Sequence, residues 1–194
     1  MTRPRIREEQ PLPLVDRRYP APVPPTPPPF RVLFVCWGNI CRSPTAEAIL
    51  RSCVDEAGLT GRIEVDSAGT SDEHAGSPPD RRAQAEAARR GLDLSDLRAR
   101  RVTPDDWDRF DLLLVADPVV ERRLLRQAPR GAPIEKVEHI TAFVAADHPG
   151  GVPDEVPDPY YGGSDGFRDV YDILESACAG ILDRAQSHLA APSN

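Results

Sequence analysis

Short runs of apolar residues recur along the chain at intervals that suit an alternation of strands and helices. Residues 32–35 (Val-Leu-Phe-Val) are continuously apolar and residues 110–116 nearly so, which is typical of strands buried on both faces. Residues 62–66 alternate between polar and apolar positions, and residues 134–140 fit a fourth strand. The pattern therefore predicts four short strands that are well separated in the sequence.

Helical spacing of apolar residues follows the predicted strands. Ser43 near the N-cap and Pro44 at the first helical position predict the start of the first helix. Gly58 and Gly91 predict the ends of two helices, because glycine readily adopts left-handed backbone. Strands alternating with helices imply an α/β fold, with a parallel sheet covered on both faces. The predicted helices span residues 43–57, 80–90, 119–127 and 165–187, with a short one starting at residue 103.

The first part of the chain has a different composition. Residues 20–29 read Pro-Ala-Pro-Val-Pro-Pro-Thr-Pro-Pro-Pro, which removes backbone donors and favours solvated polyproline II conformations over a packed core. We therefore expect residues 1–29 to be a disordered extension, with a ligand for a proline-binding module as the alternative. The remaining residues 30–190 suit a single domain in this 194-residue chain.

Composition narrows the possible partners. The formal net charge of −7 argues against nucleic acid or an anionic membrane as the main partner. No apolar run approaches the ~20 residues that span a bilayer, and the charged N-terminus lacks the apolar core of a signal peptide. The histidines form no metal-ligand spacing with one another or with the cysteines. The few cysteines are expected to be thiols of a reducing compartment such as the cytoplasm: Cys36, Cys41, Cys53 and Cys178. Cys53 and Cys178 fall at helical spacing with apolar residues, so both are expected to be core thiols.

The turn after the first strand contains the densest candidate chemistry. Cys36 ends the strand, and a tight turn with Gly38 and Asn39 leads to Arg42 and Ser43 at the helix start. Backbone N–H groups of such a turn and the helix dipole form an anion pocket. Arg42 can bind two oxygens of an oxyanion, and the Ser43 hydroxyl can stabilise a thiolate at Cys36. A pocket of this kind can accept a phosphoryl group covalently.

A proton donor for the leaving oxygen is expected in the long loop over residues 147–163, because long loops in compact domains tend to be functional. Asp158 lies there between two prolines and is followed by Tyr160 and Tyr161, whose rings could pack on a substrate. Asp-Pro is also an ordinary turn dipeptide, so both interpretations stay open. Ser67 and Asp117 follow other strands, and the carboxyl ends of parallel strands meet at one edge of a sheet.

Two segments resemble the signature of the low-molecular-weight protein tyrosine phosphatases. They are residues 36–47 (Cys-Trp-Gly-Asn-Ile-Cys-Arg-Ser-Pro-Thr-Ala-Glu) and residues 158–161 (Asp-Pro-Tyr-Tyr). The similarity extends over about residues 31–186, and its extended form is more specific than a bare C-x5-R pattern. It implies a three-layer α/β/α fold with a four-stranded parallel sheet, of the flavodoxin-like, phosphotyrosine phosphatase I type.

The resemblance also implies roles for residues of this chain. Cys36 would be the nucleophile that forms a phosphocysteine, Arg42 would bind the phosphate, and Asp158 would protonate the leaving phenol. Ser67 and Asp117 would support the loop, and no metal or organic cofactor is expected. The implied substrate-binding residues are Trp37, Gly38, Asn39, Ile40, Cys41, Ser43, Tyr160 and Tyr161. Cys41 could in addition trap oxidised Cys36 as a reversible disulfide.

The implied substrate is a phosphotyrosine-containing protein or a small aryl phosphate, with phosphoarginine left open and the protein a monomer or weak dimer. An arsenate reductase on the same fold is one alternative, although residues 70–100 contain no relay cysteine. A phosphate- or phosphopeptide-binding module without turnover is another, but it would not need Asp158. One departure from the family concerns support of the loop, because Leu97 stands where the family often has histidine.

Overall fold

The computed structural model describes residues 28–191 of the chain. The predicted proline-rich extension therefore lies outside the described residues, except for its last two, and stays a prediction. Within residues 28–191, no helix combines the length and apolar character needed to cross a membrane.

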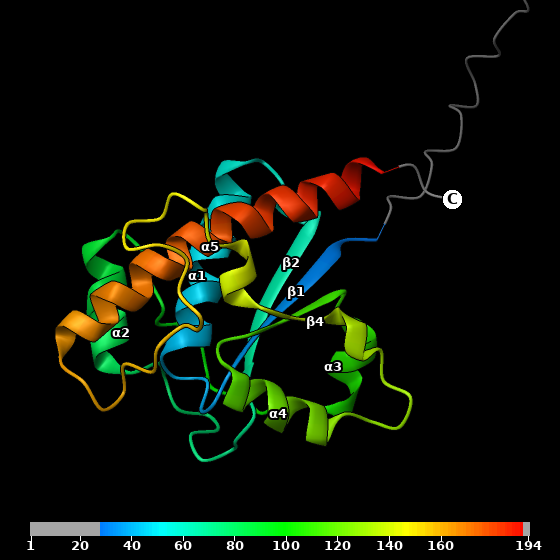
Figure 1. Ribbon diagram of the computed structural model, residues 1–194, viewed down its shortest axis with the longest axis horizontal. Helices are drawn as coiled ribbons and strands as arrows, with labels where there is room; N and C mark the ends of the chain where they lie inside the picture. Colours follow the sequence, from blue (N-terminus) through cyan, green and yellow to red (C-terminus); the bar gives the residue numbers. More distant parts are fainter. Residues whose placement is uncertain (1–27, 192–194) are drawn as a thin grey trace, which may run out of the picture.

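Four parallel strands form one sheet, as predicted, and their order is β2-β1-β3-β4 (Figure 1). β1 is central, and its last residue, Cys36, lies opposite Gly69 at the end of β2. This shared carboxyl edge is where ligand sites occur in open α/β sheets. The strands are β1 (Phe30–Cys36), β2 (Ile63–Gly69), β3 (Leu112–Val115) and β4 (Val137–His139).

Helices cover both faces of the sheet, which makes the fold a three-layer α/β/α arrangement (Figure 1). Alternate residues of β1 enter two separate cores, because successive side chains of a strand point to opposite faces. Phe34 packs in the core shared with α1 and α5, and Val35 packs in the core shared with α3 and α4. The helices are α1 (Arg42–Glu56), α2 (Arg81–Arg89), α3 (Pro104–Arg109), α4 (Pro118–Gln127) and α5 (Ser164–Ala190).

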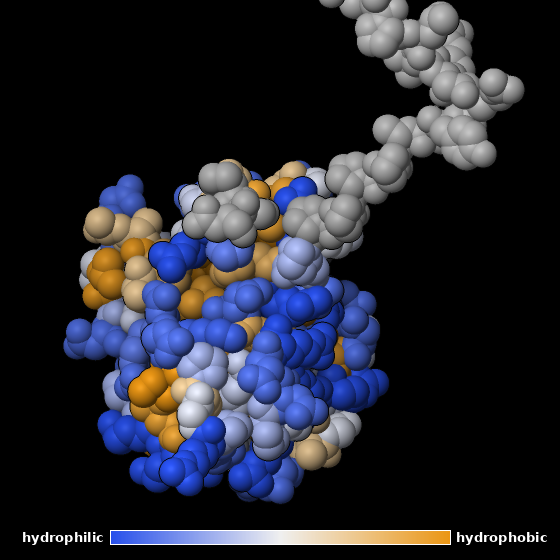
Figure 2. All heavy atoms as spheres, turned by 90° about the vertical axis from the view of Figure 1, so that its right-hand side faces the viewer, coloured by the Kyte–Doolittle hydropathy of each residue, from blue (hydrophilic) through white to orange (hydrophobic). Residues whose placement is uncertain are grey.

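The outer surface is polar on the side where the described chain begins and ends. Figure 2 shows this face as largely hydrophilic, with scattered apolar groups. Isolated apolar groups of this kind are normal on a folded protein.

The start of α1 differs from the prediction. The helix begins at Arg42 with Cys41 at the N-cap, so Ser43 and Pro44 lie inside the first turn. The hydroxyl of Ser43 does not cap the helix, because it donates a hydrogen bond to the sulfur of Cys36 instead. The loop after β1 thus winds directly into the helix.

The fourth strand is also shorter than predicted. Only Val137–His139 pair with β3, and 3₁₀ turns occupy Ile134–Lys136 and Ile140–Phe143. β4 is one of the two edge strands of the sheet, and its three residues pair with β3 alone. β2 is longer than predicted, because it stays paired with β1 as far as Gly69.

Candidate active site

The loop between β1 and α1 folds around the sulfur of Cys36. Asn39 has a φ of 56°, a left-handed conformation that asparagine tolerates better than most residues. Gly38 also tolerates that conformation, but its φ is not positive. A Cβ at Gly38 would lie 2.8 Å from Cδ2 of His74, so a larger residue there would require the His74 ring to move.

Two donors converge on the thiol. The backbone N–H of Asn39 lies 3.3 Å from the Cys36 sulfur, and the Ser43 hydroxyl lies 3.0 Å from it. The residue is only 3% exposed, so water cannot solvate a thiolate there freely. Both donors point at the sulfur and can hydrogen-bond to negative charge there when the thiol reacts.

A chain of side-chain hydrogen bonds continues from this sulfur into the protein. The amide nitrogen of Asn39 donates to Ser43 Oγ at 2.9 Å and to Ser67 Oγ at 2.8 Å. The Ser67 hydroxyl in turn donates to Glu47 Oε2 at 2.6 Å. The resemblance implies that Asn39, Ser43 and Ser67 hold the loop and the thiolate by hydrogen bonds, and their side chains lie in this chain of contacts. The Ser43 hydroxyl contacts the Cys36 sulfur directly, whereas the Asn39 side chain positions Ser43.

Glu47 is a functional residue that sequence reasoning missed. It is 2% exposed, and burial raises its pKa to about 7 despite the hydrogen bond from Ser67 and the nearby charge of Arg51. Arg51 forms an ion pair with it one helical turn further along α1. Leu97 is buried in the apolar core, so no histidine supports the loop from that position.

Arg42 is buried at the other end of the loop. Its Nη1 donates to Asp117 Oδ2 at 2.5 Å and to the carbonyl oxygen of Val156 at 3.1 Å, and its Nη2 donates to Asp158 Oδ2 at 3.3 Å. Burial alone would lower the pKa of Arg42, but Cys36, Asp158 and Asp117 together raise it. The guanidinium is therefore a fixed positive charge beside the thiol.

Asp117 links this charge to the second helical layer. Its Oδ1 accepts hydrogen bonds from the backbone N–H groups of Val119 and Val120, at 2.7 and 2.8 Å, and thereby caps α4. Its other oxygen accepts from Arg42. Because both oxygens are engaged, Asp117 holds the guanidinium in one orientation.

These groups border a cleft of about 260 Å³. It contains Cys36, Arg42 and Asp158 together with the predicted aromatic residues, whereas Ser67 and Asp117 lie behind the lining. The lining residues are Cys36, Trp37, Gly38, Ile40, Cys41, Arg42, Glu73, His74, Asp158, Tyr160 and Tyr161. Glu73 and His74 were not predicted to face it. The sequence places them after β2 at the correct edge, but it does not say which way they point.

The aromatic side chains that form the walls of the cleft differ in how strongly their neighbours fix them. The guanidinium of Arg123 lies 3.7 Å from the ring centroid of Trp37, which fixes the indole by a cation–π contact. The rings of Tyr160 and Tyr161 meet edge to face, with centroids 5.1 Å apart. Tyr161 is 93% exposed, so it forms the outer rim of the cleft.

The remaining cysteines are poor candidates for the nucleophile. Burial raises the pKa of Cys41, and the charge of Asp80 adds to the effect. Cys178 is buried in the core, as predicted, and burial likewise raises its pKa. Cys53 was predicted to be buried as well, but it is only partly so. Neither Cys53 nor Cys178 faces the cleft.

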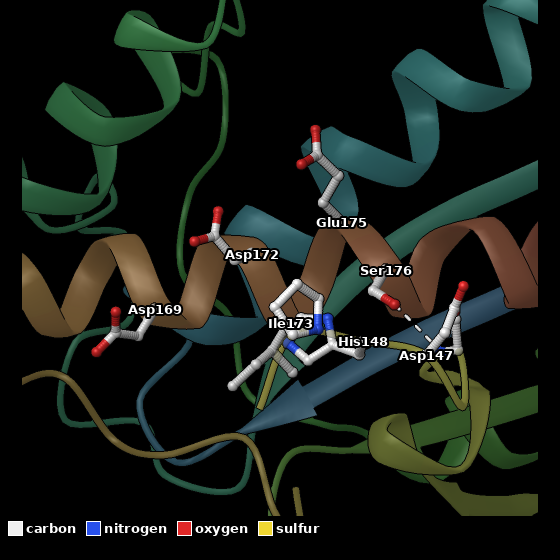
Figure 3. A pocket seen from close by; sticks show the side chains of 9 residues that line it. Asp147, His148, Asp169, Asp172, Ile173, Glu175 and Ser176 are labelled. Atoms are coloured by element: carbon white, nitrogen blue, oxygen red, sulfur yellow. Dashed lines mark hydrogen bonds between the residues drawn. The ribbon is translucent and has the colours of Figure 1, made fainter. Parts of the chain in front are cut away.

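A wider hollow of about 650 Å³ lies beside α5 (Figure 3), and Cys36 is not among its lining residues. Acidic side chains dominate its lining, among them Asp147, Asp169, Asp172 and Glu175. Asp172 and Glu175 form ion pairs with Arg90. Such a lining repels phosphate and contains no cysteine, so the smaller cleft is the candidate active site.

Comparisons with known proteins agree with this geometry. A family model described as "Low molecular weight phosphotyrosine protein phosphatase" matches residues 31–191. A low molecular weight protein-tyrosine-phosphatase of Streptomyces coelicolor is 42% identical over 153 residues, which is 79% of this chain and 92% of the relative. The human low molecular weight phosphotyrosine protein phosphatase is 36% identical over 155 residues, which is 79% of this chain and 94% of the relative.

Solved structures of protein tyrosine phosphatases also resemble this chain. The crystal structure of a protein tyrosine phosphatase from Entamoeba histolytica superposes with a TM-score of 0.75 at 36% sequence identity. The match covers 82% of this chain and 99% of that chain.

Proposed function

The chain belongs to the low molecular weight phosphotyrosine protein phosphatase family, and from that membership we propose that Cys36, Arg42 and Asp158 are its catalytic residues. As a protein-tyrosine-phosphatase it hydrolyses phosphomonoesters through a phosphoenzyme on a cysteine. We assign the catalytic domain to residues 30–190. One observation carries the assignment: a hydrogen-bonded thiol, a buried guanidinium and a carboxyl group meet in one cleft.

In the first step the Cys36 thiolate attacks the phosphorus atom of the substrate. Arg42 and the backbone N–H groups of the loop bind the phosphoryl oxygens as their charge shifts in the transition state. The bond from phosphorus to the phenolic oxygen breaks, and its electron pair stays with that oxygen. The carboxylic acid of Asp158 transfers its proton there, which releases the phenol and leaves a phosphocysteine.

In the second step water attacks the phosphorus atom of the phosphocysteine. The carboxylate of Asp158 takes a proton from this water, and the bond between sulfur and phosphorus breaks. Cys36 leaves as a thiolate, which the hydrogen bonds from Ser43 and Asn39 stabilise. Inorganic phosphate is released, and Asp158 is protonated for the next turnover.

The shape of the cleft favours a phosphate carried on an aromatic ring. Cys36 lies at its floor, so the phosphate must reach past the walls formed by Trp37, Tyr160 and Tyr161. Phosphotyrosine is long enough and offers a flat ring to these walls, whereas phosphoserine is shorter and has none. We propose a phosphotyrosine-containing protein or a small aryl phosphate as the substrate.

The proposal places the protein in the cytoplasm. A nucleophilic thiol must stay reduced, and Cys36 has the second thiol of Cys41 in the same loop. The oligomeric state, monomer or weak dimer, stays a prediction.

Neither alternative function has comparable support. Arsenate reduction would need a relay cysteine, and Cys53 and Cys178 both lie outside the cleft lining. A module that only binds phosphate would not need a carboxyl group in the cleft, but Asp158 lines it.

Hydrolysis of p-nitrophenyl phosphate by a Cys36→Ser variant tests the proposal. We expect a loss of about 10⁴-fold or more in kcat/KM, because the nucleophile is removed. Cys53→Ser is the matched control, since Cys53 lies outside the cleft, and should keep wild-type activity. A folded Cys36→Ser protein with wild-type activity would contradict the assignment.

A further inference from the structure

The loop over residues 147–163 places Asp158 in the cleft, and it is tied down before that residue. The backbone N–H of Val156 donates to the carbonyl oxygen of Ala116 at 2.9 Å. The carbonyl oxygen of Val156 accepts a hydrogen bond from Arg42 at 3.1 Å, and its side chain is fully buried. This side of the loop is thus fixed to the end of β3.

Arg82 ties the same loop down after Asp158. Its Nη2 donates to the carbonyl oxygen of Tyr160 and its Nη1 donates to that of Gly162, each at 3.0 Å. The guanidinium also lies 4.6 Å from the ring centroid of Phe167. The N–H of Tyr160 donates to Asp158 Oδ1 at 3.2 Å, so the segment that Arg82 holds contacts the carboxylate directly.

Arg82 is itself held by Asp80, which contacts the loop around Cys36. Nε and Nη2 of Arg82 donate to the two oxygens of Asp80 at 3.0 and 2.8 Å. The backbone N–H of Asp80 donates to the carbonyl oxygen of Ile40 at 2.7 Å. The hydrogen bond from Arg82 is the main reason that the pKa of Asp80 is lowered, so the pair stays ionised at neutral pH. Asp80 and Arg82 therefore connect the two loops of the active site.

We propose that Arg82 is the residue that positions Asp158 for proton transfer, by fixing the loop after it onto the loop that holds the nucleophile. Arg82 does not line the cleft, so it acts through Asp158 and not on the substrate. Proton transfer depends steeply on geometry, and a misplacement of about 1 Å can cost about 100-fold in rate. The inference rests on the proposed role of Asp158 as general acid.

A series of aryl phosphates with increasingly basic leaving groups tests the inference through kcat/KM. For Arg82→Ala we expect a loss of about 10- to 100-fold with phenyl phosphate and less than about 2-fold with p-nitrophenyl phosphate. A good leaving group needs little help from an acid, so it should tolerate a misplaced Asp158. An equal loss across the series would overturn the proposal.

Two further variants keep this test independent of folding. Arg81→Ala changes the exposed neighbour in the same turn of α2, which makes none of these contacts, and should leave kcat/KM unchanged throughout. Arg82→Lys keeps the charge without the planar fork that reaches two carbonyls and a carboxylate. Arg82→Lys should also lose more kcat/KM with phenyl phosphate than with p-nitrophenyl phosphate, but to a smaller degree. It replaces Arg82→Ala in the test if Arg82→Ala does not fold. Wild-type selectivity in a folded Arg82→Lys would count against the proposal.

A double-mutant cycle with Asp158→Ala separates positioning from a general structural role. If Arg82 acts through Asp158, adding Arg82→Ala to Asp158→Ala should lower kcat/KM for phenyl phosphate no further. If the double variant instead loses kcat/KM by the product of the two single losses, the positioning role of Arg82 is wrong. If Asp158→Ala alone shows no dependence on the leaving group, the proposed acid is wrong. If the loss of kcat/KM depends on the leaving group in Asp158→Ala but not in Arg82→Ala, only the role of Arg82 is refuted.

Discussion

Glu47 is the buried end of the hydrogen-bond chain that starts at the sulfur of Cys36. Its carboxyl group is shielded from water, and its contacts with Ser67 and Arg51 offset only part of the cost of its charge. Leu97 is packed in the core, so the described contacts behind the loop run through Ser67 to Glu47. The protonation of Glu47 therefore enters the stability of the folded protein.

The raised pKa of Glu47 predicts a change in stability with pH. The folded protein keeps this proton up to about pH 7, whereas the unfolded chain loses it near 4.5. The contribution to the free energy of unfolding is complete below about pH 4.5 and is lost as pH rises through 7, by roughly 3 kcal/mol in total. Urea denaturation of wild type and Glu47→Gln at pH 5 and pH 8 measures it.

Glu47→Gln should lose much less stability between these two pH values than wild type, since the amide does not titrate. Glu135→Gln, at an exposed position, is the control and should follow wild type. The same pH dependence in all three proteins would mean that Glu47 is ionised throughout.

For single residues of the active site, the sequence could predict those whose position follows from the end of a strand or from a motif. Cys36 had to lie at the carboxyl end of β1, and Arg42 had to follow it across a short turn. Glu47, His74 and Arg82 could not be assigned in the same way. Their roles depend on contacts with segments far away in the sequence, which a local pattern does not encode.

Among the elements, the end of β2 shapes the loop that binds phosphate. A Cβ on Gly69 would lie 2.7 Å from the carbonyl oxygen of Trp37 and 3.1 Å from the backbone nitrogen of Asn39. Backbone atoms cannot move aside as a flexible side chain can. β2 therefore presses directly on the loop, and only glycine permits this approach.

Gly69→Ala should push this loop out of place. We expect kcat/KM for p-nitrophenyl phosphate to fall by about 100-fold and inhibition by inorganic phosphate to weaken, because the N–H groups no longer converge. Gly163→Ala is the control, since a Cβ there meets nothing within 4 Å and its φ of −85° suits alanine. Wild-type kinetics in Gly69→Ala would show that the loop does not depend on this contact.

The sequence predicted the presence of the helices and strands more accurately than the residues at which they end. The pairing of β2 with β1 carries its extended conformation to Gly69, beyond the alternating pattern. β4 is shorter than predicted, because its pairing with β3 covers only Val137–His139 and 3₁₀ turns flank it. In both cases pairing between strands decided the boundary, and that information is not local.

At the scale of the whole molecule, the sheet order brings distant segments to one edge. β1 supplies Cys36, the end of β3 leads to Asp117, and the loop before α5 supplies Asp158. β1 begins at Phe30, at the end of the strand opposite Cys36. A parallel sheet with both faces covered leaves this edge as the place where loops can meet.

Rapid quenching of the Asp158→Ala variant during turnover of p-nitrophenyl phosphate, followed by mass spectrometry of its peptides, tests the central claim most directly. Loss of Asp158 slows the hydrolysis of the intermediate, so the phosphoenzyme should accumulate. We predict one phosphoryl group on the peptide that contains Cys36 and Cys41, with fragmentation assigning it to Cys36. Turnover without this adduct, or a phosphoryl group on another residue, would contradict the account.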